Sequence, residues 1–278
     1  MNNKLQSDTP KLLLYVTIII SLIITIFPIF YLVLTSIKPS QLLYSVPPEF
    51  FFKLSFESFQ QVFIEGEAGK YLINSLIVTI SSTIIAVFLG ALAAFILAIV
   101  QFKYKKAFYF TILITRMYPP ITTLIPIYLI MQFLGLLDTY PALTLPYAGT
   151  QIALATMILY SFYKDLPVSI FESALIDGCS GWNLFLKLAL PLSKTGLVSA
   201  GILIFILDWN EFLFGLALTS TSAKTAPVAL TSYLEQEGML QWGAVASMGT
   251  LMITPIIIFV FVFRQYLIKG LTSGATKG

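Results

Sequence analysis

Three charged residues stand inside stretches that are otherwise apolar: Arg116, Asp208 and Glu211. Asp208 and Glu211 are three positions apart, which places them on one face of a helix. A charge at the centre of a bilayer costs roughly 2.5–3.5 kcal/mol on insertion scales, so such residues face a bundle interior or a wet path. We therefore expect Arg116 and the two carboxylates, with the nearby Tyr118 and Asn210, to line a translocation path or its gate, and Arg116 to pair with the carboxylates. The alternative is a structural ion pair that joins two spans.

Other chemistry is excluded by residue type. The chain has no His and one Cys, Cys179, so imidazole metal sites, His-based catalysis and an intramolecular disulfide are all absent. It also lacks the G-x-x-x-x-G-K-[ST] loop that cradles nucleotide phosphates. We therefore expect no catalytic residues, no metal and no cofactor in this chain. A net charge of +3 is small and indicates no nucleic-acid partner.

The composition predicts that these residues are carried by a membrane protein. Hydrophobic residues make up 58% of the 278 and charged residues 10%, whereas soluble domains carry about a quarter charged residues. A chain so poor in charge cannot cover a surface that faces water. We therefore predict an all-α polytopic membrane protein that forms one transmembrane domain over 1–278, with the lipid bilayer as its solvent.

Six apolar runs are long enough to cross a bilayer, which takes about 20 helical residues. They cover 12–36, 74–100, 107–134, 143–163, 195–218 and 244–266. Continuous apolar runs predict helices rather than the alternating segments of a β-barrel. Pro119, Pro120 and Pro126 interrupt the third run, which predicts a kinked helix, either as a hinge lining the path or as a packing feature.

Basic residues predict the orientation of the chain. With both termini in the cytoplasm, eleven Lys and Arg fall in inside segments and four in outside segments. The longer connections are then an external loop at 37–71, a cytoplasmic loop at 164–194 and an external loop at 219–243. The remaining segment, 267–278, is a cytoplasmic tail that we expect to be flexible.

The sequence of the cytoplasmic loop predicts two short amphipathic helices. Ser169 followed by Glu172 fits a capping box, with Ser169 as the N-cap. Gly178 stands where the first helix should end, Ser180 where a second should begin, and Pro191 where that helix should break. Such a pair presents a rigid knob to a soluble partner, or only anchors the loop at the membrane surface.

The same loop resembles the EAA motif of ABC importer permeases, which reads E-A-A-x-x-D-G, nine residues, then I-x-L-P. Ser173 for Ala and Leu188 for Ile are conservative departures, and the spacing is intact. The opening of the second run at Asn74-Ser75-Leu76, the W-N-x-F-like stretch at Trp209 and the glycine-rich ending resemble the carbohydrate, maltose-type subfamily, and its smaller six-span subunit in particular. The matching positions of the motif are Glu172, Ser173, Ala174, Asp177, Gly178, Leu188, Leu190 and Pro191.

The resemblance implies a type I importer permease in the cytoplasmic (inner) membrane of a prokaryote. It implies that the EAA-like positions couple the chain to two ATPase subunits, which hold the ATP and Mg. It also implies a homologous second permease, an external solute-binding protein and a sugar or oligosaccharide as substrate. A non-sugar solute such as a glycerophosphate or polyol stays open, as do an ion-coupled secondary transporter and, least favoured, an intramembrane enzyme.

Two further stretches have open roles. In the subfamily, the loop at the position of 219–243 reaches into the docked binding protein. Here the loop contains Thr225-Ala226-Pro227-Val228 and 235–238. The alternative is that this loop is only a solvated connector. The tail at 267–278 resembles tails that enter the interface between ATPase subunits. Tyr118 and Tyr147 are candidates for stacking on sugar rings.

Overall fold

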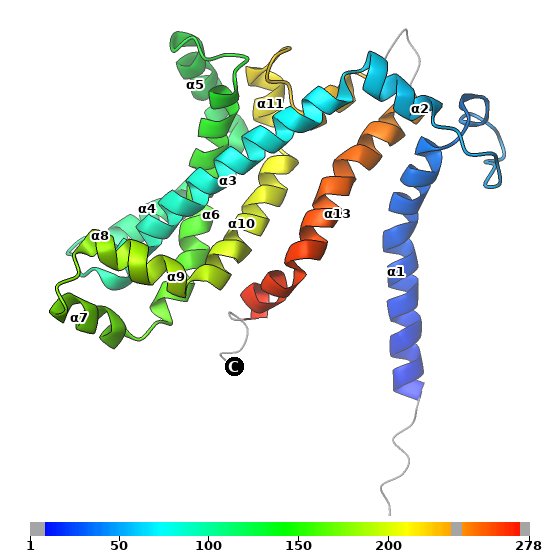
Figure 1. Ribbon diagram of the computed structural model, residues 1–278. Helices are drawn as coiled ribbons and strands as arrows, with labels where there is room; N and C mark the ends of the chain where they lie inside the picture. Colours follow the sequence, from blue (N-terminus) through cyan, green and yellow to red (C-terminus); the bar gives the residue numbers. More distant parts are fainter. Residues whose placement is uncertain (1–8, 235–240, 273–278) are drawn as a thin grey trace, which may run out of the picture. The chain divides into compact units, whose positions relative to one another are not determined.

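The computed structural model describes residues 9–234 and 241–272, and helix is the regular structure found over these residues. The long helices in Figure 1 are α1 (Thr9–Ser36), α3 (Ala68–Ile99), α6 (Tyr140–Lys164), α10 (Lys194–Trp209) and α13 (Trp242–Thr272). The shorter elements are η1 (Ser40–Leu42), α2 (Glu57–Gln60), η2 (Gln61–Glu65), α4 (Lys105–Thr115), α5 (Pro120–Phe133), α7 (Val168–Ile176), α8 (Gly181–Leu184), η3 (Phe185–Ala189), α9 (Leu190–Leu192), α11 (Leu213–Leu218) and α12 (Ala226–Thr231).

The chain divides into two compact units. The first comprises the described parts of Met1–Ala68 and Leu230–Ile253, and the second those of Gly69–Ala229 and Thr254–Gly278. Helix α13 runs through both units. The single domain expected over 1–278 stays a prediction.

Four helices of the described chain are long and apolar enough to cross a membrane, and there are up to six spans if each of two bent pairs is counted as one. The four are α1, α3, α6 and α13, which match the first, second, fourth and sixth predicted runs. The all-α membrane class is therefore confirmed with four to six candidate spans, whereas the side on which the termini lie stays a prediction.

The third predicted span is not one kinked helix. It consists of α4 and α5, which are bent by 92° at a break that contains Arg116 and Pro119. Pro119 takes an extended backbone as the N-cap of α5, and Pro120 occupies the first turn of that helix. Proline fits a first turn because the N–H that it lacks has no helical partner there. Pro119 and Pro120 therefore start α5, whereas Pro126 lies inside that helix.

The fifth predicted span also differs from one continuous helix. Helix α10 ends at Trp209, and α11 begins at Leu213 after a break. A second bend, of 78°, separates the short helices ending at Leu192 from α10. The expected flexible tail is wrong in part, because α13 continues to Thr272; 273–278 lie outside the described residues.

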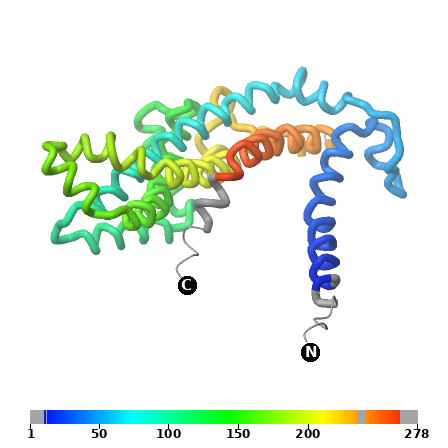
Figure 2. Tube along the Cα trace, turned by 60° about the horizontal axis from the view of Figure 1, so that its bottom comes forward, coloured from blue at the N-terminus to red at the C-terminus, as the bar shows by residue number. Residues whose placement is uncertain are grey.

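In the second unit, α6 packs against α10, and α3 contacts α6 at Gly90 and α10 at Gly201. Figure 2 shows the α7–α9 stretch at one end of this group. Gly90 of α3 lies so close to α6 that a Cβ there would collide with the Cβ of Ala155 and lie 3.0 Å from the Thr156 nitrogen. Helices whose backbones approach this closely need a residue without a side chain at the contact. This packing positions the two sites described next.

Candidate coupling segment and polar cluster

The turn between α7 and α8 is built around Gly178. Its φ is +83°, a left-handed conformation that strains any residue with a Cβ. The Gly178 N–H donates to the Leu175 carbonyl over 3.1 Å, and the Cys179 N–H donates to the Ala174 carbonyl over 2.9 Å. This is the Schellman pattern of helix termination. The structure confirms the predicted end of the first helix at Gly178 and the start of the second after Ser180.

Two local predictions for this segment were wrong. Helix α7 begins at Val168 with Pro167 as its N-cap, so Ser169 is inside the first turn and makes no cap. Pro167 itself has an extended backbone, with φ −60° and ψ 125°, so the helix begins at the next residue. Pro191 does not break the second helix; it lies in α9, directly after the π-helical turn η3, and the 78° bend follows at Ser193.

The segment is fixed to the bundle by one apolar cluster. Phe171 of α7, Leu184 of α8 and Phe185 of η3 are buried against side chains of α3, α6 and α10. The Phe95 ring centroid lies 5.6 Å from that of Phe185 and 6.1 Å from that of Phe171. Aromatic contacts of this kind add to the stabilisation from burial. The segment and the three helices α3, α6 and α10 therefore share one packed core.

The eight EAA-like residues divide by exposure. Glu172, Ser173, Asp177, Gly178 and Pro191 are exposed. Ala174, Leu188 and Leu190 pack against the cluster just described.

Beside the exposed set, Leu175 is 55% exposed and Ile176 is 87% exposed. An apolar tip of this kind marks a contact surface. The exposed members can meet a partner, and the packed members hold the segment in place.

A polar cluster crosses three helices in the middle of the second unit. The Ser82 hydroxyl of α3 donates to Asp208 Oδ2 of α10 over 2.5 Å, and Gln151 Nε2 of α6 donates to Asp208 Oδ1 over 3.1 Å. Arg116 Nη1 donates to the Gln151 side-chain oxygen over 3.2 Å. Asp208 is 3% exposed, whereas Arg116, at the α4–α5 break, is exposed. The arginine therefore reaches Asp208 through Gln151 and not by a direct ion pair.

The other predicted path residues lie apart from this chain of hydrogen bonds. Glu211 is beyond the end of α10 and accepts hydrogen bonds from the Phe214 and Gly215 N–H groups, so it caps α11 and does not share a helix face with Asp208. Asn210 bonds back to the Ile206 carbonyl, and Tyr118 is 60% exposed.

Tyr147 does not meet the requirements of a stacking platform for sugar. It is 2% exposed and packs against Phe214, so no ring face is open in this structure.

A second hydrogen-bonded assembly fixes the segment after α11. Asp138, in the loop before α6, accepts from the N–H groups of four consecutive residues, 220–223, and from the Thr221 hydroxyl. Partial burial acts to raise the pKa of Asp138, but these donors outweigh it and hold the pKa well below its ordinary value. Asn74 Nδ2 donates to the Ser222 and Lys224 carbonyls, and the Ser75 hydroxyl accepts from the Ala226 N–H.

The predicted external loop at 219–243 is therefore partly ordered and buried. Thr225, Ala226, Pro227 and Val228 are buried, so these four residues are not a solvated connector. The acidic stretch at 235–238 lies outside the described residues.

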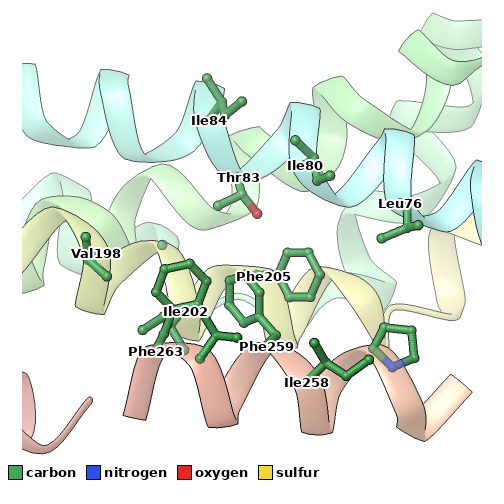
Figure 3. A pocket seen from close by; sticks show the side chains of 13 residues that line it. Leu76, Ile80, Thr83, Ile84, Val198, Ile202, Phe205, Ile258, Phe259 and Phe263 are labelled. Atoms are coloured by element: carbon green, nitrogen blue, oxygen red, sulfur yellow. The ribbon is translucent and has the colours of Figure 1, made fainter. Parts of the chain in front are cut away.

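An apolar cavity of about 560 Å³ lies between α3, α10 and the second half of α13 (Figure 3). Ile80, Ile202, Phe205 and Phe259 are among its lining residues, and Thr83 is the residue that brings a hydroxyl to it. Sugar sites need several placed polar groups. The polar cluster therefore fits a hydrophilic path better than this cavity does.

Gln151 and Ser82 are the site residues that sequence reasoning missed. Both are polar residues within apolar runs, which was the available signal. A neutral side chain does not stand out as a charged one does, and its partners come from runs far apart in the sequence.

Comparisons with known proteins define the class. Residues 86–273 match the family described as "Binding-protein-dependent transport system inner membrane component". The trehalose transport system permease protein SugB of Mycobacterium tuberculosis is 37% identical over 227 residues, which are 81% of this chain and 83% of that protein. The trehalose/maltose transport system permease protein MalG of Thermococcus litoralis is 30% identical over 271 residues, 96% of this chain and 97% of that protein.

The fold agrees with this placement. A chain from the crystal structure of a bacterial ABC transporter involved in the import of the acidic polysaccharide alginate superposes with a TM-score of 0.82 at 20% identity, over 96% of this chain and 99% of that one. The protein belongs to the family of binding-protein-dependent inner membrane components and is a multi-pass permease subunit of an ABC importer. The resemblance carried by the EAA-like loop is thus confirmed, and the importer is supported over an ion-coupled transporter.

Proposed function

We propose that this chain forms half of the translocation path of an importer for a sugar or oligosaccharide. Its relatives named for trehalose and maltose transport support this substrate class. The second half would come from a homologous permease, and an external solute-binding protein would deliver the substrate. Two ATPase subunits on the cytoplasmic side would hold the ATP and Mg, since this chain carries no P-loop.

The observation that carries the mechanism is the contrast between the two faces of the α7–α9 segment. One face is buried on α3, α6 and α10, and the other presents Glu172, Asp177 and the apolar tip at Ile176. We assign the exposed face to a cleft of the ATPase subunit. Closure of the ATPase pair would displace the segment as one body, because its buried face is closely packed against the neighbouring helices.

Helix α10 connects the two sites. It begins at the 78° bend after the segment and, with 16 residues, is about 24 Å long. Asp208 lies in its last turn, so a displacement at the segment would reach the Arg116–Gln151–Asp208–Ser82 cluster through a rigid element. Because α3, α6 and α10 are all packed on the segment, their displacement would stretch the hydrogen bond that Arg116, at the α4–α5 break, donates to Gln151. We place the gate of the polar path there.

The test uses the assembly purified from native membranes and reconstituted with its binding protein. Glu172→Ala is compared with Glu65→Ala, an exposed glutamate of the segment between α1 and α3. We expect Glu172→Ala to lose the ATPase subunits, or the coupling of ATP hydrolysis to transport, while the second permease still co-purifies. Equal behaviour of the two variants would contradict the coupling role.

The substrate class is tested separately by uptake into proteoliposomes. Labelled trehalose, maltose or glycerol phosphate is added outside the vesicles together with the cognate binding protein. ATP is enclosed inside the vesicles. ATP-dependent uptake of a sugar and not of glycerol phosphate is expected. Uptake of glycerol phosphate alone would contradict the substrate class but leave the coupling mechanism intact.

A further inference from the structure

Lys38, which follows the apolar helix α1, is a buried cation. It is 4% exposed, and its Nζ lies 5.4 Å from the centroid of the Phe52 ring. Within 9–234 and 241–272, no carboxylate pairs with this ammonium group. A ring face attracts a cation but does not replace the hydrogen bonds that the ammonium group loses with water. Lys38 Nζ is not one of the fully enclosed polar atoms without a partner, so the ammonium group stays open to an acceptor that enters the site.

The ammonium group belongs to the lining of a cavity of about 400 Å³ in the first unit. Residues of α1, from Pro28 to Thr35, form one wall, and Trp242, Val245 and Ala246 of α13 contribute to the other. The two walls are joined nearby, where the Ser247 hydroxyl donates to the Ser36 carbonyl over 3.3 Å. The cavity is thus part of a packed contact between two helices.

The lining is amphiphilic. Tyr31, Leu32 and Trp242 present apolar surface, while Lys38 places one positive charge at the end of a membrane-length helix. Tyrosine and tryptophan favour the depth at which lipid headgroups meet the hydrocarbon. Helix α1 also exposes apolar side chains along its length, such as Ile24 at 67% and Leu13 at 69%. A continuous apolar track therefore leads away from the charged end.

We propose that this cavity binds the headgroup of an anionic phospholipid, with phosphate oxygens accepting hydrogen bonds from Lys38 Nζ. The apolar walls would cover the glycerol and the first acyl carbons, and the chains would continue along α1. The inference goes beyond the proposed transport function. A free phosphate would meet Lys38 but leave the apolar walls uncovered, whereas a phospholipid would cover both.

The experiment measures lipid binding to the purified importer by native mass spectrometry. The probes are phosphatidylglycerol, phosphatidylcholine and inorganic phosphate alone. Lys38→Met removes the charge and keeps the length of the side chain, Lys38→Arg restores the charge, and Lys53→Met removes an exposed charge from the same external segment. Val245→Phe fills the cavity and leaves Lys38 unchanged.

We expect Lys38→Met to weaken phosphatidylglycerol binding about tenfold, the effect of losing one charge-assisted hydrogen bond. Lys38→Arg and Lys53→Met should bind as the wild type does, and phosphatidylcholine binding should not change. If the importer with Lys38→Met does not assemble, Val245→Phe tests the same prediction, and it should also bind phosphatidylglycerol more weakly than the wild type does.

Three results would overturn the proposal. The first is equal phosphatidylglycerol binding by Lys38→Met and Lys53→Met. The second is full displacement of the lipid by inorganic phosphate, which would make a free anion the ligand. The third is unchanged lipid binding with loss of the second permease from Lys38→Met, which would assign the lysine to a subunit contact.

Discussion

Replacing Gly178 by alanine isolates the role of the turn between α7 and α8. A Cβ at this position meets nothing within 4 Å, so the change causes no collision. The cost comes from the backbone, because φ is +83° and an L-residue pays roughly 1–2 kcal/mol in the left-handed region. That cost lowers the population of the folded turn by a factor of roughly 5–30. Asparagine tolerates this conformation better, so Gly178→Asn should lose less.

The assay is the ratio of substrate transported to ATP hydrolysed in proteoliposomes, measured beside thermal unfolding of the assembly. Gly181→Ala is the matched control, since a Cβ there also meets nothing within 4 Å and its backbone lies at the start of α8 without a positive φ. We expect Gly178→Ala to lower the transport ratio with α7 intact, and Gly181→Ala to leave it unchanged. Equal ratios for the two variants would refute the argument that the left-handed turn sets the docking face.

Three further predictions concern the second unit. Asp208→Asn turns an amide donor toward Gln151 or Ser82, which should lower the free energy of unfolding by about 1–3 kcal/mol in thermal melts. Transport should also fall while the ATPase subunits stay bound. Unchanged transport would argue against a gate. Asp138→Asn should destabilise the protein near neutral pH. Because the folded-state pKa of Asp138 is lowered, this stability is fully present above the ordinary carboxyl pKa of ~4 and is lost progressively as pH falls from there through the lowered pKa. The difference between the melting temperatures of wild type and variant should therefore shrink steadily below pH ~4, and a constant difference would contradict this. Gly90→Ala should cost about 1–3 kcal/mol or more by forcing α3 from α6, and a melting temperature equal to wild type would show that the contact is loose.

The amount of apolar sequence determined the class of fold. Runs of about 20 apolar residues in a chain with 10% charge have one stable solution in a bilayer, because helices satisfy their own backbone. The turn at Gly178 was equally predictable, since glycine is the residue that takes a left-handed φ at a helix end without strain. These features depend on local composition and local backbone sterics.

Predictions that assumed one helix across a proline or polar break failed. Arg116 and Pro119 mark a 92° turn rather than a kink, and Glu211 caps α11 because α10 has already ended. A three-residue spacing places two carboxylates on one face only if the helix continues between them. Whether a helix continues past such a residue depends on which neighbouring helices bury the break. The residues next to the break do not reveal those neighbours.

The sequence by itself determined the helical membrane class, the EAA-like positions and the unusual charges within apolar runs. The tertiary structure decided that Arg116 meets Asp208 through Gln151, that Ser82 completes the cluster, and that Phe171 and Phe185 anchor the α7–α9 segment. It also placed Lys38 in a cavity between α1 and α13. Each of these depends on contacts between helices distant in the chain, which are set by how side chains pack together and not by any periodicity within a single run.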